Sequence, residues 1–202
     1  MADPVVVGII GHSYVKRLER FILQNPVYKN LCLNEGRIKV CFRDQGGLSV
    51  CGLVNSPRLC TFPIVPSLCF LEIGGNDAAT RPANVIAQDI WSYTNYLIHV
   101  LGVKNVIIEQ LLRRDPWKSP LGYNTEVLQI NKHLDQLTAN HDQVHFWKYR
   151  GFGDNLSYLG RDGVHLQEVT SEDSPAPMVK YPRSIKYAVH NRVQKFKASY
   201  HL

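Results

Sequence analysis

The chain has 202 residues, of which 45% are hydrophobic and 20% are charged, which suits one domain with a sizeable core. No segment approaches the roughly 18 consecutive apolar residues of a membrane span, and the N-terminal MADPVVV lacks the charged region and length of a signal peptide. The net charge is +6, and the excess lies entirely between Pro175 and Leu202, so we expect a soluble, cytoplasmic protein with one domain over residues 1–202 and a basic tail.

Short apolar runs alternate with longer amphipathic patterns along the chain. The runs predict strands at residues 5–10, 37–42, 68–73, 106–109 and 144–147. The patterns predict helices at residues 13–23, 83–101, 124–137 and about 183–198. Residues 46–55 are ambiguous, and residues 168–182, rich in Ser and Pro, are expected to form a loop. Continuous apolar strands separated by helices indicate an α/β protein: a three-layer α/β/α sandwich around a five-stranded parallel sheet.

Polar and glycine-containing blocks follow the predicted strands. These blocks are Gly11-His12-Ser13, Gly46-Gly47, Gly74-Gly75-Asn76-Asp77, Arg113-Arg114 and Asp162-Gly163-Val164-His165. Because ligands bind beyond the carboxyl ends of parallel strands, we expect these blocks to meet at one edge of the sheet.

Each block also has a plain structural interpretation. Ser13 suits a helix cap, Gly46-Gly47 suits a turn, the third block suits a turn with a capping Asn or Asp, and His165 suits a structural histidine. Arg113 and Arg114 suit an exposed surface. The occurrence of the glycine, serine, asparagine and histidine blocks together, in chain order, favours one functional site over separate coincidences.

The four blocks with Ser13, Gly47, Asn76 and His165 resemble those of the SGNH/GDSL serine hydrolases, and the resemblance spans nearly the whole chain. It implies a flavodoxin-like sheet and hydrolysis of esters without metal or cofactor. The segments GGND, QLLRR, RDGVHL and KYPRSIKYAV further resemble SGNH domains carried by animal retrotransposons.

The resemblance implies a Ser-His-Asp mechanism. Ser13 is the expected nucleophile, His165 its base, and Asp162 the group that orients the histidine. The backbone N–H groups of Ser13 and Gly47 and the Asn76 amide are the expected oxyanion-hole donors. The expected substrate is a small ester or a lipid-like ester, and Arg113 and Arg114 are candidates for binding an anionic head group.

One residue departs from the family pattern, because His12 stands where these enzymes usually have Asp. We expect His12 to support the turn and His12→Asp to retain activity. Two alternatives to an ester hydrolase remain open. One is a catalytically weak binding module of the same fold, acting in a retroelement particle; the other is a nucleotide-binding protein, which the lack of a glycine-rich phosphate loop disfavours.

The five cysteines are odd in number and form no CxxC pair, so we expect free thiols rather than disulfides or a zinc site. The basic tail contains six Lys and Arg residues and no acidic one. It is expected to be either a solvated helix face or a surface that binds anionic lipid or nucleic acid.

Overall fold

The protein is described here by a computed structural model that places residues 3–168 and 176–199. Its centre is a parallel sheet of five strands in the order β2-β1-β3-β4-β5. The strands are β1 (Val5–Gly11), β2 (Ile38–Asp44), β3 (Leu68–Glu72), β4 (Asn105–Glu109) and β5 (Val144–Trp147). The order changes direction between β1 and β3, which makes the sheet doubly wound and confirms the predicted fold class.

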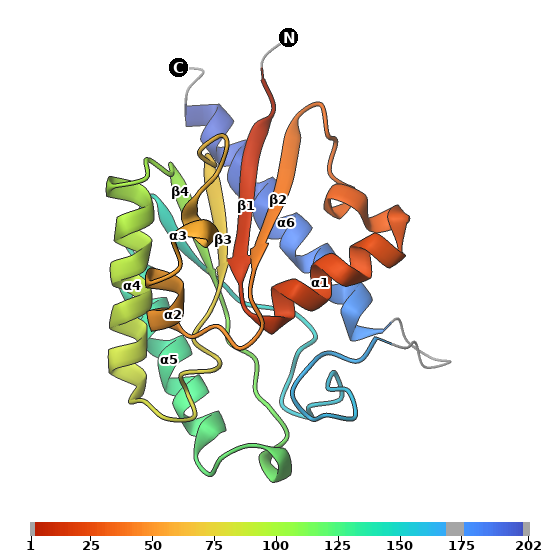
Figure 1. Cartoon of the computed structure of the whole chain (residues 1–202), viewed down its shortest axis with the longest axis vertical. Helices are drawn as coiled ribbons and strands as arrows, with labels where there is room; N and C mark the ends of the chain where they lie inside the picture. The colour runs from red at the N-terminus through yellow and green to blue at the C-terminus, as the bar shows by residue number, and fades with distance from the viewer. Residues whose placement is uncertain (1–2, 169–175, 200–202) are drawn as a thin grey trace.

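Helices cover both faces of the sheet (Figure 1). One face is covered by α2 (Val50–Val54), α3 (Pro57–Cys60), α4 (Ala83–His99) and α5 (Tyr123–Thr138). The other is covered by α1 (Ser13–Gln24), the 3-10 segment η1 (Pro26–Cys32) and α6 (Pro177–Ser199). A second short 3-10 turn, η2 (Pro116–Lys118), follows β4.

Two apolar layers hold the sandwich together, and neighbouring residues of one strand contribute to different layers. Leu71 of β3 packs in the layer with Ile90 of α4, whereas Phe70 packs in the layer with Ile185 of α6. Full burial of such a side chain stabilises a fold by about 1.5–3 kcal/mol. Both faces of the strands are therefore apolar, and the strands read as continuous apolar runs.

The prediction of a loop over residues 168–182 is wrong in its last part, because α6 already begins at Pro177. Proline lacks an N–H group, but the first helical residue needs none, so it starts a helix readily. The ambiguous residues 46–55 contain the short helix α2, whose first turn is capped by the Ser49 side chain, which accepts a hydrogen bond from the Gly52 N–H. Residues 169–175 of the expected loop lie outside the described residues.

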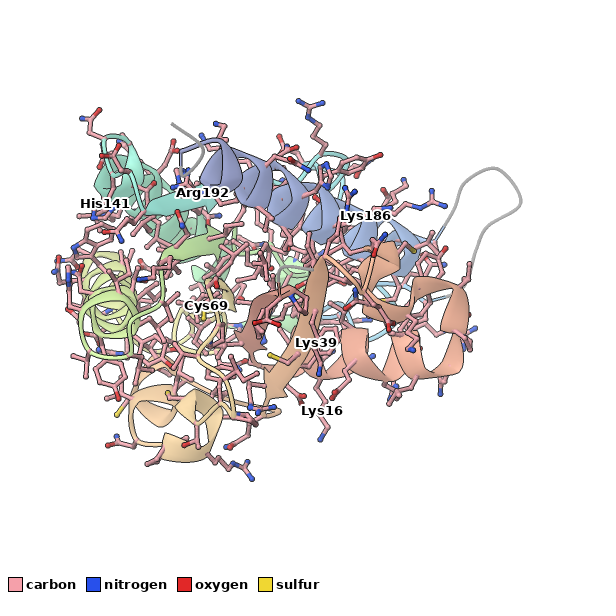
Figure 2. All side chains as sticks on the ribbon, turned by 90° about the horizontal axis from the view of Figure 1, so that it is seen from above. Lys16, Lys39, Cys69, His141, Lys186 and Arg192 are labelled. Atoms are coloured by element: carbon pink, nitrogen blue, oxygen red, sulfur yellow. The ribbon has the colours of Figure 1, made fainter. Side chains whose placement is uncertain are left out.

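The basic helix α6 is also a core element. Tyr181, Ile185 and Val189 are buried against the sheet, and Arg192 donates from Nε to the Asn105 side chain at 2.7 Å and from Nη2 to the Asp142 carbonyl. Figure 2 shows Arg192 near one end of α6, beside the segment that carries His141. Part of the basic tail therefore serves packing. Within residues 3–168 and 176–199, no helix has the length and apolar character needed to cross a bilayer.

Candidate active site

Ser13 is the first residue of α1, directly after β1 ends at Gly11 and the chain turns through His12. Its hydroxyl Oγ lies 2.9 Å from Nε2 of His165, which is 152 positions away in the sequence. The helix-cap interpretation of Ser13 is not supported, because the cap position belongs to His12, and no side chain bonds back to the helix there. The side chain of Ser13 instead faces the loop that carries the histidine.

Asp162 completes a line of three side chains. Its Oδ2 lies 2.8 Å from Nδ1 of His165, and its Oδ1 accepts the backbone N–H groups of Val164 and His165 at 3.0 and 2.9 Å. The carboxylate is therefore fixed by the loop whose histidine it orients. With Nδ1–H directed at Asp162, Nε2 is left to accept the hydrogen bond of the Ser13 hydroxyl.

The surroundings set the protonation of this line. Burial lowers the pKa of His165, with a further contribution from the Arg17 charge, against the hydrogen bond to Asp162, which acts to raise it. Burial acts to raise the pKa of Asp162, but the hydrogen bonds from His165 and Val164 outweigh it and hold that pKa well below its usual range. At neutral pH the line thus consists of a carboxylate and a neutral imidazole beside a serine hydroxyl, which is the state a general base requires.

Tyr14 connects the loop that carries His165 to α1. Its hydroxyl donates a hydrogen bond to the Val164 carbonyl, and its ring centroid lies 5.5 Å from that of His165. Sequence reasoning did not single out Tyr14, because its position on the buried face of an amphipathic helix predicts only a core side chain.

The loop after β2 and the block after β3 are bonded to each other. Asn76 donates from Nδ2 to the Leu48 carbonyl at 3.0 Å, and its Oδ1 accepts from Nη2 of Arg114 at 3.2 Å. Gly47 has a φ of +72°, a conformation that favours glycine, and its N–H makes no hydrogen bond within the described part of the chain. Gly47 and Asn76, two of the three residues expected to supply oxyanion donors, therefore lie in one connected pair of loops.

Asp77 adds a further bond between the block after β3 and the segment that follows Gly47. Its buried carboxylate accepts the Val50 N–H at 3.0 Å, at the start of α2, and pairs with Arg81 at 3.3 Å. The sequence block contained Asp77, but the residue it would bond, 27 positions earlier, had no local signal.

The two arginines after β4 diverge. Arg113 pairs with Asp154, whereas the guanidinium of Arg114 stacks over the Tyr123 ring at 4.5 Å and bonds Asn76. Among the described residues, Arg114 has no carboxylate partner. Of the predicted pair, only Arg114 contacts another residue named for the site.

A hollow of about 760 Å³ adjoins the Asp162 end of the line. It is lined by Arg17, Leu159, Gly160, Arg161, Asp162, Leu166, Gln167 and Glu168. A second hollow, of about 530 Å³, lies between α4 and α5 and includes His133 and Asp89 but none of the residues named for the site. Of the Ser13–His165–Asp162 line, only Asp162 lines the first hollow and none lines the second.

The fold is similar to that of several solved structures. A GDSL-like lipase from Bacteroides thetaiotaomicron is 17% identical with a TM-score of 0.69, and the match covers 95% of this chain and 93% of that one. The lipase/acylhydrolase from Enterococcus faecalis is 15% identical with a TM-score of 0.66, covering 93% and 96%. The psychrotrophic esterase EstA from a Pseudoalteromonas species, in a structure inhibited by monoethylphosphonate, is 13% identical with a TM-score of 0.59, covering 92% and 99%. No family model and no curated protein matches the sequence.

Proposed function

We propose that the protein is a serine hydrolase that cleaves esters by a Ser-His-Asp mechanism. The observation that carries this proposal is the hydrogen-bonded line from Ser13 to His165 to Asp162 at the carboxyl edge of the sheet. The fold shared with lipases, acylhydrolases and an esterase supports it. Serine is a weak nucleophile until a fixed base takes its proton, and this line provides that base.

The reaction follows from the geometry. Oγ of Ser13 attacks the acyl carbon while its proton passes to Nε2 of His165, and the Asp162 carboxylate stabilises the resulting imidazolium. The oxyanion accepts hydrogen bonds from the N–H groups of Ser13 and Gly47 and from the second N–H of the Asn76 amide. His165 then protonates the leaving alcohol. A water molecule, deprotonated by the same histidine, attacks the acyl carbon, and His165 returns that proton to Oγ of Ser13 as the bond to the acid breaks.

The substrate we propose is a small ester or a lipid-like ester. Arg114 stands beside Asn76 without a carboxylate partner among the described residues, so it suits an anionic group on the acid side of the ester. Arg113 is already paired with Asp154 and is not proposed for this role. The finer resemblance to SGNH domains of retrotransposons rests on the sequence segments quoted above, and it would place the reaction in a retroelement protein.

A partner at the basic helix is a separate part of the proposal. Arg183 is exposed on α6, with Lys180 and Lys186 half-buried on the same helix, and these three side chains suit contact with anionic lipid or nucleic acid. Such binding would weaken as salt rises, because exposed charges are screened within about 10 Å at 0.1 M. Arg192 is excluded from it, since it bonds Asn105 and Asp142.

Hydrolysis of a short-chain p-nitrophenyl ester by the wild type and by Ser13→Ala tests the proposed function. We expect Ser13→Ala to lose several orders of magnitude in kcat/KM. Ser92→Ala, the same change at an exposed serine of α4, is the control and should match the wild type. A fluorophosphonate probe should label the wild type at Ser13. A folded wild type that neither hydrolyses the ester nor takes the label would favour the binding module instead.

A further inference from the structure

Two buried carboxyl groups lie behind the turn that carries Ser13. Glu72 ends β3 and Glu109 ends β4, and the parallel register that pairs Leu71 with Ile108 sets these two glutamates side by side. Glu72 is 4% exposed and Glu109 is 2% exposed. Two carboxylates cannot both stay ionised when they are buried this close together, so the pair needs a proton, a cation or both.

Glu109 is held by two tyrosines. Tyr149 and Tyr181 both donate their hydroxyl groups to Oε2 of Glu109, the latter at 3.1 Å. Burial, then the Glu72 charge and a hydrogen bond to Glu72, raise the pKa of Glu109 well above its usual range, against the opposing effect of the tyrosines. The Tyr181 hydroxyl also lies 3.4 Å from Oε1 of Glu109, farther than from Oε2, and Glu109 shares a hydrogen bond with Glu72. A proton held between the two carboxyl groups fits this arrangement.

The imidazole ring of His12 faces Glu72. Nε2 of His12 lies 3.0 Å from Oε1 of Glu72, although the two are not aligned for a hydrogen bond, and His12 is only 1% exposed. The ring fits because position 75 is glycine: a Cβ there would stand 3.0 Å from Nε2. His12, Glu72 and Glu109 form a cluster that polar and charged side chains surround. These side chains are Tyr14, Tyr123, Tyr149, Tyr181 and Arg114.

We propose that His12 is a positioning residue, an imidazolium paired with the Glu72 carboxylate, while Glu109 is a neutral acid bonded to Glu72. These three side chains together then carry no net charge. The ring, fixed between β3 and Gly75, holds the backbone turn from which the next residue, Ser13, projects toward His165. The effect on catalysis rests on the proposed ester hydrolysis, whereas the charge balance of the cluster does not.

With this arrangement of charges, His12→Asp is expected to lose activity rather than to retain it. Aspartate at position 12 would bring a third carboxyl group against two that are already buried, and it would remove the imidazolium proposed to pair with Glu72. His12→Asp should therefore be more damaging here than the neutral change His12→Gln.

A double-mutant cycle on the full chain tests the pairing. The variants of the cycle are His12→Gln, Glu72→Gln and the double variant. Two further variants are controls: Glu109→Gln has the shape of a neutral glutamic acid, and His145→Gln makes the same histidine change on β5. The readouts are kcat and KM for the p-nitrophenyl ester and the thermal unfolding midpoint. We expect His12→Gln to lose about 10²-fold in kcat with little change in KM, as a misplaced nucleophile would.

The double variant should recover part of the loss in kcat and in midpoint, because it leaves no unpaired charge. Glu109→Gln and His145→Gln should stay within a few-fold of the wild type. Additive losses, or a Glu109→Gln as damaging as Glu72→Gln, would overturn the proposal, as would a double variant that fails to fold beside a folded His12→Gln. If the wild type hydrolyses no ester, the proposed function fails, and the unfolding midpoints of the same proteins still decide the charge balance.

Discussion

Arg17 lies one turn after Ser13 on α1 and lowers the pKa of His165, the candidate base. Its Nη2 lies 3.3 Å from Oδ2 of Asp162, and its Nη1 lies 3.5 Å from Glu168. A cation at this place opposes a second positive charge on His165, and it contributes to the lowered pKa of that residue. The guanidinium is partly exposed, so this influence is moderated by solvent.

The pH dependence of hydrolysis should report this influence. Only neutral His165 can accept the serine proton, so kcat/KM should fall as pH drops through the lowered pKa of His165. Arg17→Gln removes a charge that disfavours the imidazolium, so it should raise that pKa and move the acidic limb to higher pH. Arg20→Gln is the control, because Arg20 also bonds Glu168 but is not among the causes of the His165 shift. If the acidic limbs of the pH profiles coincide in the wild type, Arg17→Gln and Arg20→Gln, this influence of Arg17 on His165 is contradicted.

Arg114 is expected to act through Asn76. Its hydrogen bond to Oδ1 fixes which end of the amide faces the loop after β2. Arg114→Gln should lower kcat for a neutral ester. The corresponding loss of transition-state stabilisation should be smaller than the roughly 3 kcal/mol that removal of a whole oxyanion donor costs. Steady-state kinetics beside Arg113→Gln, whose arginine pairs with Asp154, measure the effect. Equal losses in the two variants would refute a specific role for Arg114.

At the scale of elements, the short helix α2 links the two loops of the site. Its N-terminus is bound by Asp77 from the block after β3, and the loop before it is bound by Asn76. A helix of five residues has little stability of its own, so these long-range bonds fix its place. The orientation of the Gly47 N–H depends on the same contacts.

Asp77→Ala should therefore lower both stability and activity. Loss of the bond to Val50 resembles loss of a helix cap, which costs about 0.5–2 kcal/mol. The loosened loop should reduce kcat further. Asp89→Ala is the matched control, because Asp89 binds the same Arg81 but does not reach α2. Urea unfolding and ester kinetics of the two variants would separate the effects, and an Asp77→Ala with unchanged kcat would show that α2 is not coupled to the site.

The elements differ in how well the sequence could predict them. All five strands were predicted within two residues of their observed bounds, since a buried apolar run is a local signal. The short elements α2, α3 and η1 were not, because contacts such as Asp77 to Val50 are not local. The order of the motifs along the chain was enough to group Ser13, His165 and Asp162. Glu72 was hidden inside an apolar run, and its partners His12 and Glu109 come from the turn after β1 and from β4.

At the scale of the whole molecule, α6 spans the sheet and anchors its far edge. Val193 is buried, and Arg192 bonds Asn105 at the start of β4 and Asp142 before β5. A chain ending at Asn191 loses both residues, which should cost about 2–4 kcal/mol of stability. Hydrolysis of a neutral ester below the unfolding temperature should persist.

The control for this truncation is a chain ending at Lys195, which keeps Arg192 and Val193. Thermal midpoints and kcat/KM of the two shortened chains and the full chain give the comparison. A truncation at Asn191 that remains folded yet hydrolyses no ester would show that the end of α6 acts in the chemistry and not only in packing.

The parallel sheet also fixes which way the molecule would face when it is tethered. β1 begins and α6 ends at the end of the sheet opposite the turn that carries Ser13 (Figure 1). A bead, a surface or a further domain joined beyond either of these points would hold the molecule at the end of the sheet that lies opposite the turn with Ser13. Ser13 and His165 would then point outward, and an immobilised layer should react with a dissolved ester much as the free protein does.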